Sequence, residues 1–161
     1  MSQPRPRSTR FLLALAPLAL GLQGCDLDPS GPAFHADELR AARAAWAGQG
    51  IDSYRYVIAR SCGECTPESI APALVEVRGG KTVSVVAATS VQQIQPELYR
   101  QFDTVEELFD VIEDAIDQDP YRFSARYDSR TGVPVSYAAD MDRSMVDDER
   151  GFTVSQFEEI Q

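Results

Sequence analysis

The sequence has little of the chemistry from which catalytic sites are usually built. Its 161 residues include one histidine, His35, and three cysteines. It contains no Gly-x-Ser-x-Gly nucleophile motif, no P-loop and no dinucleotide-binding fingerprint. His35 lies at the end of an expected linker, so we do not expect a histidine general base or a catalytic triad in the folded core. The sequence therefore predicts a non-enzymatic protein that needs no cofactor.

Positive charge is scarce as well. Lys and Arg number 15 against 25 Asp and Glu, which gives a formal net charge of −10. Residues 1–24 carry three Arg and no acid, so the chain without them has a net charge of −13. Nucleic acid selects basic surfaces and anionic lipid repels acidic ones, so the charge favours neither as a direct partner of the domain. We interpret the acidity as a contribution to solubility.

The main apolar run is too short to span a bilayer, which needs about 20 apolar residues. It covers residues 11–22 and follows a basic segment that contains Arg5, Arg7 and Arg10. A basic segment followed by a short apolar segment is typical of a secretory signal. We therefore predict that residues 1–24 are a signal peptide and that the rest of the chain is exported.

Leu22-Gln23-Gly24-Cys25 closes this segment and resembles the lipobox of bacterial lipoproteins. The resemblance implies a diacylglyceryl thioether on Cys25, cleavage before it and acylation of the new amine; two or more acyl chains anchor a protein stably. The domain would then face the periplasm or the outside from the cell membrane or the outer membrane. Asp26 resembles an inner-membrane retention signal, but Leu27 does not strengthen it, so both membranes stay open. An ordinary secretory signal with an incidental Cys25 is the alternative.

Residues 25–34 include two prolines and have the composition of a linker, so we expect the lipidated cysteine to be followed by a short tether. Residues 35–161 then have the length of a single domain. Within it, Cys62 and Cys65 are an even pair that we expect to form a disulfide in an oxidising compartment. A redox role is the alternative, but Glu64 between the thiols would disfavour a reactive thiolate.

Hydrophobic periodicity predicts two helices and six strands. One helix is expected over residues 37–47, with Asp37 as its N-cap. The other is expected over 104–116, where Thr104 and Glu107 have capping-box spacing and apolar residues recur at helical intervals. Aromatic, β-branched or alternating segments predict strands at residues 54–60, 73–78, 81–87, 121–127, 133–138 and 152–157.

These elements follow the order helix, three strands, helix, three strands. Gly79-Gly80 predicts a two-residue hairpin turn, since glycine readily adopts a positive φ. Two five-residue segments are similar, Asp52-Ser-Tyr-Arg-Tyr56 and Asp119-Pro-Tyr-Arg-Phe123, and each opens an expected strand after a helix. The similarity indicates either two equivalent halves of one helix and three strands each, or a chance match. Short hairpins favour antiparallel pairing, so we expect an α+β fold with two helices packed on one face of an antiparallel sheet.

Five carboxylates gather between the last two expected strands. These metal-site candidates are Asp140, Asp142, Asp147, Asp148 and Glu149. Calcium is the functional interpretation, because hard cations take several oxygen ligands. The EF-hand pattern fails here, since Met145 and Gly151 stand where it requires Gly and Glu. A solvated acidic loop is the alternative.

Several short segments occur in an order that carries a family resemblance. They are Trp46, Tyr54-Arg-Tyr56, the Cys62/Cys65 pair, residues 75–81, residues 104–109, Tyr127-Asp128, residues 132–134 and residues 147–149. Through them the sequence resembles an uncharacterised family of bacterial secreted lipoproteins, domain of unknown function 6174, over roughly residues 40–158. That family brings no known activity, substrate or catalytic residue, so the resemblance implies none for this chain.

By elimination, we expect a membrane-anchored envelope lipoprotein whose domain binds another envelope protein. The sheet face opposite the helices is the expected surface. One alternative is a small-ligand or calcium-binding module that uses residues 140–149. A second alternative is a thiol–disulfide redox protein that uses Cys62 and Cys65.

Overall fold

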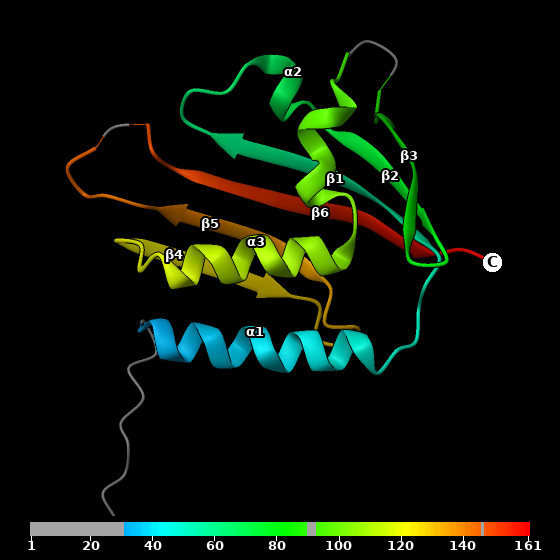
Figure 1. The fold of residues 1–161 in the computed structure, drawn as a ribbon, viewed down its shortest axis with the longest axis horizontal. Helices are drawn as coiled ribbons and strands as arrows, with labels where there is room; N and C mark the ends of the chain where they lie inside the picture. The colour runs from blue at the N-terminus through cyan, green and yellow to red at the C-terminus, as the bar shows by residue number, and fades with distance from the viewer. Residues whose placement is uncertain (1–30, 90–92, 146) are drawn as a thin grey trace, which may run out of the picture.

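The computed structural model describes residues 31–89, 93–145 and 147–161, so the predicted signal peptide and Cys25 lie outside the described residues. The described chain forms a six-stranded sheet in which all neighbouring strands are antiparallel (Figure 1). The helices are α1 (Pro32–Ala47), α2 (Pro67–Ile70), the 3-10 helix η1 (Pro96–Phe102) and α3 (Val105–Asp117). The strands are β1 (Tyr54–Cys62), β2 (Ala73–Arg78), β3 (Lys81–Ala87), β4 (Arg122–Tyr127), β5 (Pro134–Asp140) and β6 (Arg150–Glu159).

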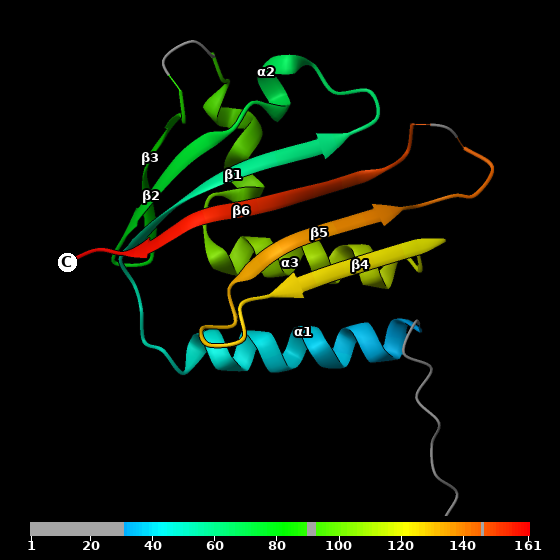
Figure 2. The same cartoon turned by 180° about the vertical axis from the view of Figure 1, so that it is seen from behind.

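The helix α3 lies across one face of the sheet. Figure 1 shows it in front of the strands, and the reverse view in Figure 2 shows it behind them. Its apolar stripe is buried, as predicted, and includes Leu108, Phe109 and Ile112. The Thr104 hydroxyl accepts a hydrogen bond from the Glu107 amide at 3.2 Å, which satisfies one of the unpaired N–H groups of the first turn.

The helix α1 runs alongside α3 and begins earlier than predicted. It starts at Pro32, with Gly31 rather than Asp37 at the N-cap, so the last residues of the expected tether are helical. Proline at the first helical position lacks an N–H that would be unpaired there anyway, which explains the early start. Asp37 instead pairs with Arg40 one turn away. No helix within the described residues is long and apolar enough to cross a membrane.

The sheet has the strand order β3-β2-β1-β6-β5-β4. Its central strand β1 alternates sharply, with Tyr54, Tyr56 and Ile58 buried toward the helices and Arg55 on the other face. The two-residue turn at Gly79-Gly80, where both residues have positive φ, is confirmed. Within the described residues no helix crosses the opposite face, which Figure 2 shows in the foreground.

The predicted order of helix, three strands, helix, three strands holds for the long elements, but two short helices were missed. The described chain has four helices rather than two, because α2 follows β1 and η1 precedes α3. Both begin with proline and are too short to show a helical apolar period. They are held by tyrosine hydroxyls: Tyr56 donates to the Phe102 carbonyl at 2.7 Å, and Tyr99 donates to the Ala71 carbonyl.

The two halves of the chain are not structural repeats. In the first half the first strand, β1, is central, whereas in the second half the last strand, β6, is central and pairs with β1. The matching tyrosines therefore differ, since Tyr54 is 1 % exposed and Tyr121 is 45 % exposed. The resemblance between the two segments reflects a shared local strand start and not equivalent positions in the fold.

Candidate functional site

The open face of the sheet carries a row of apolar side chains. Val57 on β1 lies opposite Leu74 on β2, and Leu74 lies opposite Val86 on β3. Val57 and Leu74 are partly exposed, and Val86 is 49 % exposed. Directly opposed residues on neighbouring strands have Cβ atoms roughly 5 Å apart, so the three side chains form one continuous surface. We call these three residues the apolar row.

Charged pairs border the apolar row on the same face. Arg55 donates to Glu158 through Nε at 3.0 Å and through Nη2 at 2.8 Å. Arg78 donates to Glu76 at 2.8 Å. Because each charge has a nearby partner of opposite sign, this part of the face presents both signs in balance around an apolar centre.

The Cys62–Cys65 disulfide closes the turn at the end of β1. The turn packs against the acidic segment of residues 140–149, because the Gly63 amide donates to the Glu149 carbonyl at 3.1 Å. A Cβ at Gly63 would lie 2.1 Å from the carbonyl oxygen of Asp147, so only glycine fits this contact. The disulfide is therefore part of the packing between two loops at one end of the sheet.

Carboxylates of the acidic segment accept hydrogen bonds from amide and hydroxyl groups of the same segment. Asp142 accepts hydrogen bonds from the Ser144 amide at 2.8 Å and hydroxyl at 2.7 Å, which lower the pKa of Asp142. Asp148 accepts from the Asp142 amide at 2.6 Å. Across residues 31–89, 93–145 and 147–161, no three metal-ligating side chains gather closely enough to hold an ion. Calcium binding at the candidate residues Asp140, Asp142, Asp147, Asp148 and Glu149 stays a prediction.

His35 lies within α1 rather than at the end of a tether. Its ring contacts the Phe123 ring with the centroids 4.7 Å apart, and its Nδ1 lies 3.5 Å from a Glu38 carboxylate oxygen. The histidine thus packs where α1 meets β4, at the opposite edge of the sheet from β3.

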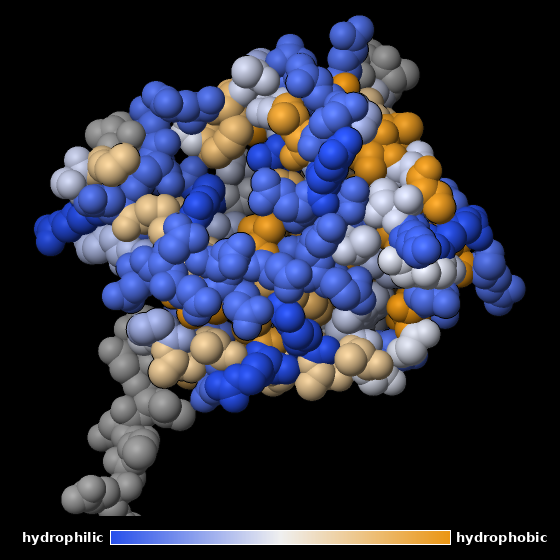
Figure 3. Space-filling view, viewed as in Figure 1, coloured by the Kyte–Doolittle hydropathy of each residue, from blue (hydrophilic) through white to orange (hydrophobic). Residues whose placement is uncertain are grey.

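A cleft opens beside the disulfide, between the end of β1, η1 and α3. Its outer part has a volume of about 860 Å³ and is lined by residues of both helices and of the disulfide turn. An inner cavity of about 290 Å³ adjoins it, and the two share Arg60, Gln101, Val111 and Asp114. Figure 3 shows that the outer surface of α3 is hydrophilic.

Arg60 lines both the outer part of this cleft and its inner cavity. Its Nη1 donates to the carbonyls of Ser69 at 3.0 Å and Leu98 at 2.8 Å, so it joins α2 to η1. Its guanidinium carbon lies 4.5 Å from the centre of the Phe102 ring. The side chain is half-buried, and burial lowers the pKa of its guanidinium.

Arg150 lines the inner cavity from β6. Its Nη2 donates to the Gln118 side chain, just after α3, at 2.9 Å. Burial raises the pKa of the neighbouring Tyr137, and the charge of Arg150 opposes that rise. Arg60 lies opposite Phe152 and Arg150 lies opposite Cys62, so the two arginines are diagonal neighbours on the helix side of β1 and β6.

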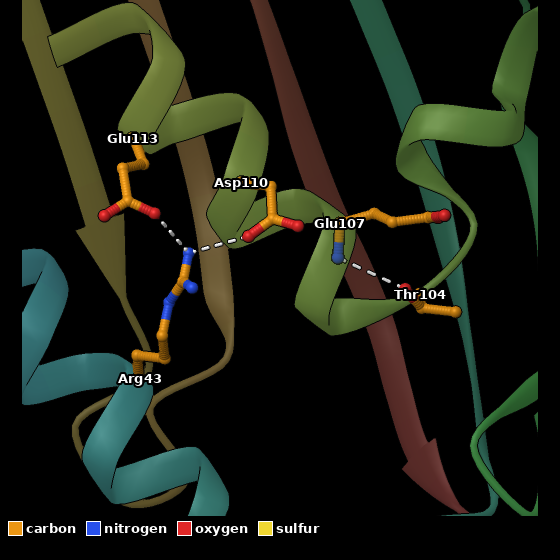
Figure 4. Close-up of polar contacts among 5 residues, drawn as sticks. All are labelled: Arg43, Thr104, Glu107, Asp110 and Glu113. Carbon is orange, nitrogen blue, oxygen red and sulfur yellow. Dashed lines mark hydrogen bonds and ion pairs between the residues drawn. The ribbon is translucent and has the colours of Figure 1, made fainter. Parts of the chain in front are cut away.

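Among the described arginines, Arg40, Arg43, Arg55 and Arg78 form ion pairs with carboxylates. Arg43 of α1 donates from Nη2 to Asp110 at 2.9 Å and to Glu113 at 3.0 Å, both on α3 (Figure 4). Neither Arg60 nor Arg150 forms an ion pair with any described residue. Each also has a buried Nε atom with no hydrogen-bond partner among the described residues.

The first turn of α3 holds a carboxyl group that takes up a proton near neutral pH. Glu107 accepts a hydrogen bond from the Asp103 amide at 3.3 Å, while its own amide donates to Thr104 (Figure 4). Burial raises the pKa of Glu107 to about 7, and both a hydrogen bond with Asp103 and the charge of Asp103 contribute to this rise. This group lines the outer part of the cleft.

A comparison with protein families gives a match over most of the chain. The model of a family described as "Family of unknown function (DUF6174)" matches residues 38–159. The chain belongs to this family. The resemblance drawn from short sequence segments is thus confirmed for the family, and the DUF6174 region runs from α1 to the end of β6. No curated protein and no solved structure gives a match.

Sequence reasoning did not identify the two arginines of the DUF6174 domain that line the inner cavity, Arg60 and Arg150. Arg60 and Arg150 lie 90 residues apart; Arg60 ends the strand expected over residues 54–60, and Arg150 lies two residues before the strand expected over residues 152–157. The one available signal was Arg60 at an inward position of an alternating strand, where an apolar residue is expected. The apolar row was anticipated as part of the sheet face opposite the helices, but not its residues.

Proposed function

We propose that this protein is a membrane-anchored envelope lipoprotein whose domain binds another envelope protein and catalyses no reaction. The anchor is the predicted lipid on Cys25. The binding surface is the open face of the sheet, centred on the apolar row. The observation that supports this proposal most directly is the register of Val57, Leu74 and Val86, which places three apolar side chains together on a face that no helix of the described residues covers.

An exposed apolar surface of this kind favours burial against another molecule. Burial of apolar area contributes about 25 cal/mol per Å², so covering the row would stabilise a complex. The flanking pairs of Arg55 with Glu158 and of Arg78 with Glu76 would suit a partner whose own surface alternates both signs of charge around an apolar centre. The proposed occupant is therefore a protein surface, and neither nucleic acid nor the bilayer itself.

The tether limits where such a partner can be. α1 begins at Pro32, seven residues after Cys25, and seven extended residues span at most about 25 Å. A domain anchored through Cys25 would therefore stay close to the membrane surface. We accordingly propose a partner that is itself held in or near the same membrane.

Site-specific photocrosslinking of the full chain in its native membranes tests the binding surface. A photoreactive residue at Val86 should give one discrete crosslinked protein product, and the same residue at Ala45, exposed on α1, should not. Leu74→Asp should remove the product, while Leu98→Asp, an exposed apolar position on η1, should leave it. Equal products from positions 86 and 45, or none at 86, would overturn the proposed surface.

The anchor has its own test. Mass spectrometry of the chain extracted from membranes should find Cys25 as an acylated N-terminus. Cys25→Ser should move the protein from the membrane fraction to the soluble fraction without changing its thermal unfolding. An unacylated chain that begins elsewhere would overturn the anchor while leaving the binding surface to be judged by the crosslinks.

A further inference from the structure

The inner cavity of the cleft combines two arginines that nothing in the described protein neutralises. Both reach it from the helix side of neighbouring strands, Arg60 from β1 and Arg150 from β6. Tyr137, Gln101 and Gln118 also line the cavity, as do Ser61 and Asp114. These residues come from β1, η1, the end of α3, β5 and β6, so only folding brings them together.

Leaving a guanidinium half-buried without a counter-ion is costly, because burial removes water from a charged group. The sequence has 25 acidic residues, yet none of the described carboxylates forms an ion pair with Arg60 or Arg150. Arg43, by contrast, takes two carboxylates at the surface. The Nε atoms of Arg60 and Arg150 are also buried without a hydrogen-bond partner among the described residues, which adds to the cost of leaving these side chains without a counter-ion.

We propose that this cavity binds a small organic carboxylate that also carries a hydrogen-bond donor, such as an amino acid or a hydroxy acid, with its carboxylate between Arg60 and Arg150. A guanidinium is planar and offers parallel donors that match the two oxygens of a carboxylate. The volume of about 290 Å³ lies at the lower limit of ordinary ligand pockets, which suits a small molecule.

Asp114 decides between classes of anion. It is the one carboxylate that lines the inner cavity, and it forms no ion pair with a described residue. Its charge would repel a phosphate dianion more strongly than a carboxylate monoanion. An ammonium or hydroxyl group on the ligand could donate to Asp114 while the carboxylate faces the arginines. The outer part of the cleft, which shares Asp114, leaves space for the remainder of a larger ligand.

Calorimetric titration of the purified full chain tests this site, with L-alanine, glycolate, acetate and inorganic phosphate as probes. L-alanine or glycolate should bind with a Kd of about 1 mM or tighter, and phosphate more weakly. Arg150→Gln should weaken that binding about tenfold or more, because a charge-assisted pair is lost. Arg55→Gln, on the open face of the sheet, is the matched control and should leave the Kd unchanged.

Two further variants guard against a folding defect. Arg60 also joins α2 to η1, so Arg60→Lys is compared only if its circular dichroism and thermal unfolding match the wild type. Asp114→Asn should weaken L-alanine while strengthening phosphate, a reversal that general destabilisation would not produce. Absence of heat with all four probes at about 10 mM, preferential binding of phosphate, or an unchanged Kd in folded Arg150→Gln would overturn the proposal.

Discussion

The hydroxyl of Tyr54 accepts a hydrogen bond from the backbone N–H of Val105 at 3.0 Å. The first residue of β1 thereby satisfies an amide in the first turn of α3, 51 residues away. The same hydroxyl donates to one carboxylate oxygen of Glu106 at 3.4 Å. The other carboxylate oxygen of Glu106 accepts a hydrogen bond from the Trp46 indole N–H at 2.8 Å. α1, β1 and α3 therefore meet at one point.

Tyr54→Phe should lower the free energy of unfolding by about 1–2 kcal/mol, because the buried Val105 amide loses its partner. Urea denaturation monitored by circular dichroism measures this loss. Tyr121→Phe is the matched control, since Tyr121 is 45 % exposed, and it should unfold at the wild-type urea concentration. A Tyr54→Phe protein as stable as the wild type would show that the contact contributes nothing.

Gly132→Ala should be among the most damaging single substitutions in the domain. Gly132 has φ of +81°, and a Cβ there would lie 2.2 Å from the carbonyl oxygen of Ala42 on α1. We expect a loss of about 3 kcal/mol or more in thermal or urea unfolding, because backbone strain and a steric clash act together. Gly50→Ala separates these two effects, since Gly50 has φ of +66° with no atom within 4 Å of the added Cβ. Its loss should stay near 1 kcal/mol.

The stability of the domain should fall between about pH 5 and pH 8 because of Glu107. Its pKa in the folded protein is raised to about 7, so the folded state holds a proton that the unfolded state has already released. The stabilisation is complete below the unfolded pKa and is lost as the pH rises through 7. Melting temperatures across this range should decline more steeply in the wild type than in Glu107→Gln.

Asp103→Asn provides a second measure of the same effect. Asp103 contributes to the raised pKa of Glu107 through a hydrogen bond and through its charge. Removing that charge should bring the pKa of Glu107 closer to its ordinary value and flatten the pH dependence as well. If wild type and both variants decline in parallel, Glu107 is not the group responsible.

The Cys62–Cys65 disulfide should contribute modestly to stability. Its loop is short, so the chain-entropy model gives a contribution of only about 2 kcal/mol. A Cys62→Ser/Cys65→Ser double variant should therefore remain folded but unfold at a lower urea concentration. The redox alternative makes a different prediction: the wild type would then reduce insulin in a standard turbidity assay and the double variant would not.

Local features of the sequence were enough to place the long elements. The apolar stripe of α3 with its Thr104 cap, the glycine turn at Gly79-Gly80 and the alternation of β1 each arise from neighbouring residues. The Cys62/Cys65 pair was recognisable for the same reason, since its spacing lies within one turn. The family could also be recognised from the order of such segments.

Only the tertiary structure decided which strands distant in the sequence lie side by side. The pairing of β1 with β6 joins residues that are 88 to 105 positions apart in the sequence, and its register is set by buried side chains that must pack against α3. That register brings Arg60 and Arg150 into one cavity. The registers of β2 with β1 and with β3 align Val57, Leu74 and Val86 on the other face. Periodicity along the chain indicates which side of its own strand a residue occupies. It carries no information about which distant strand will bury that side, because the free energy of the pairing comes from contacts that exist only in the folded molecule.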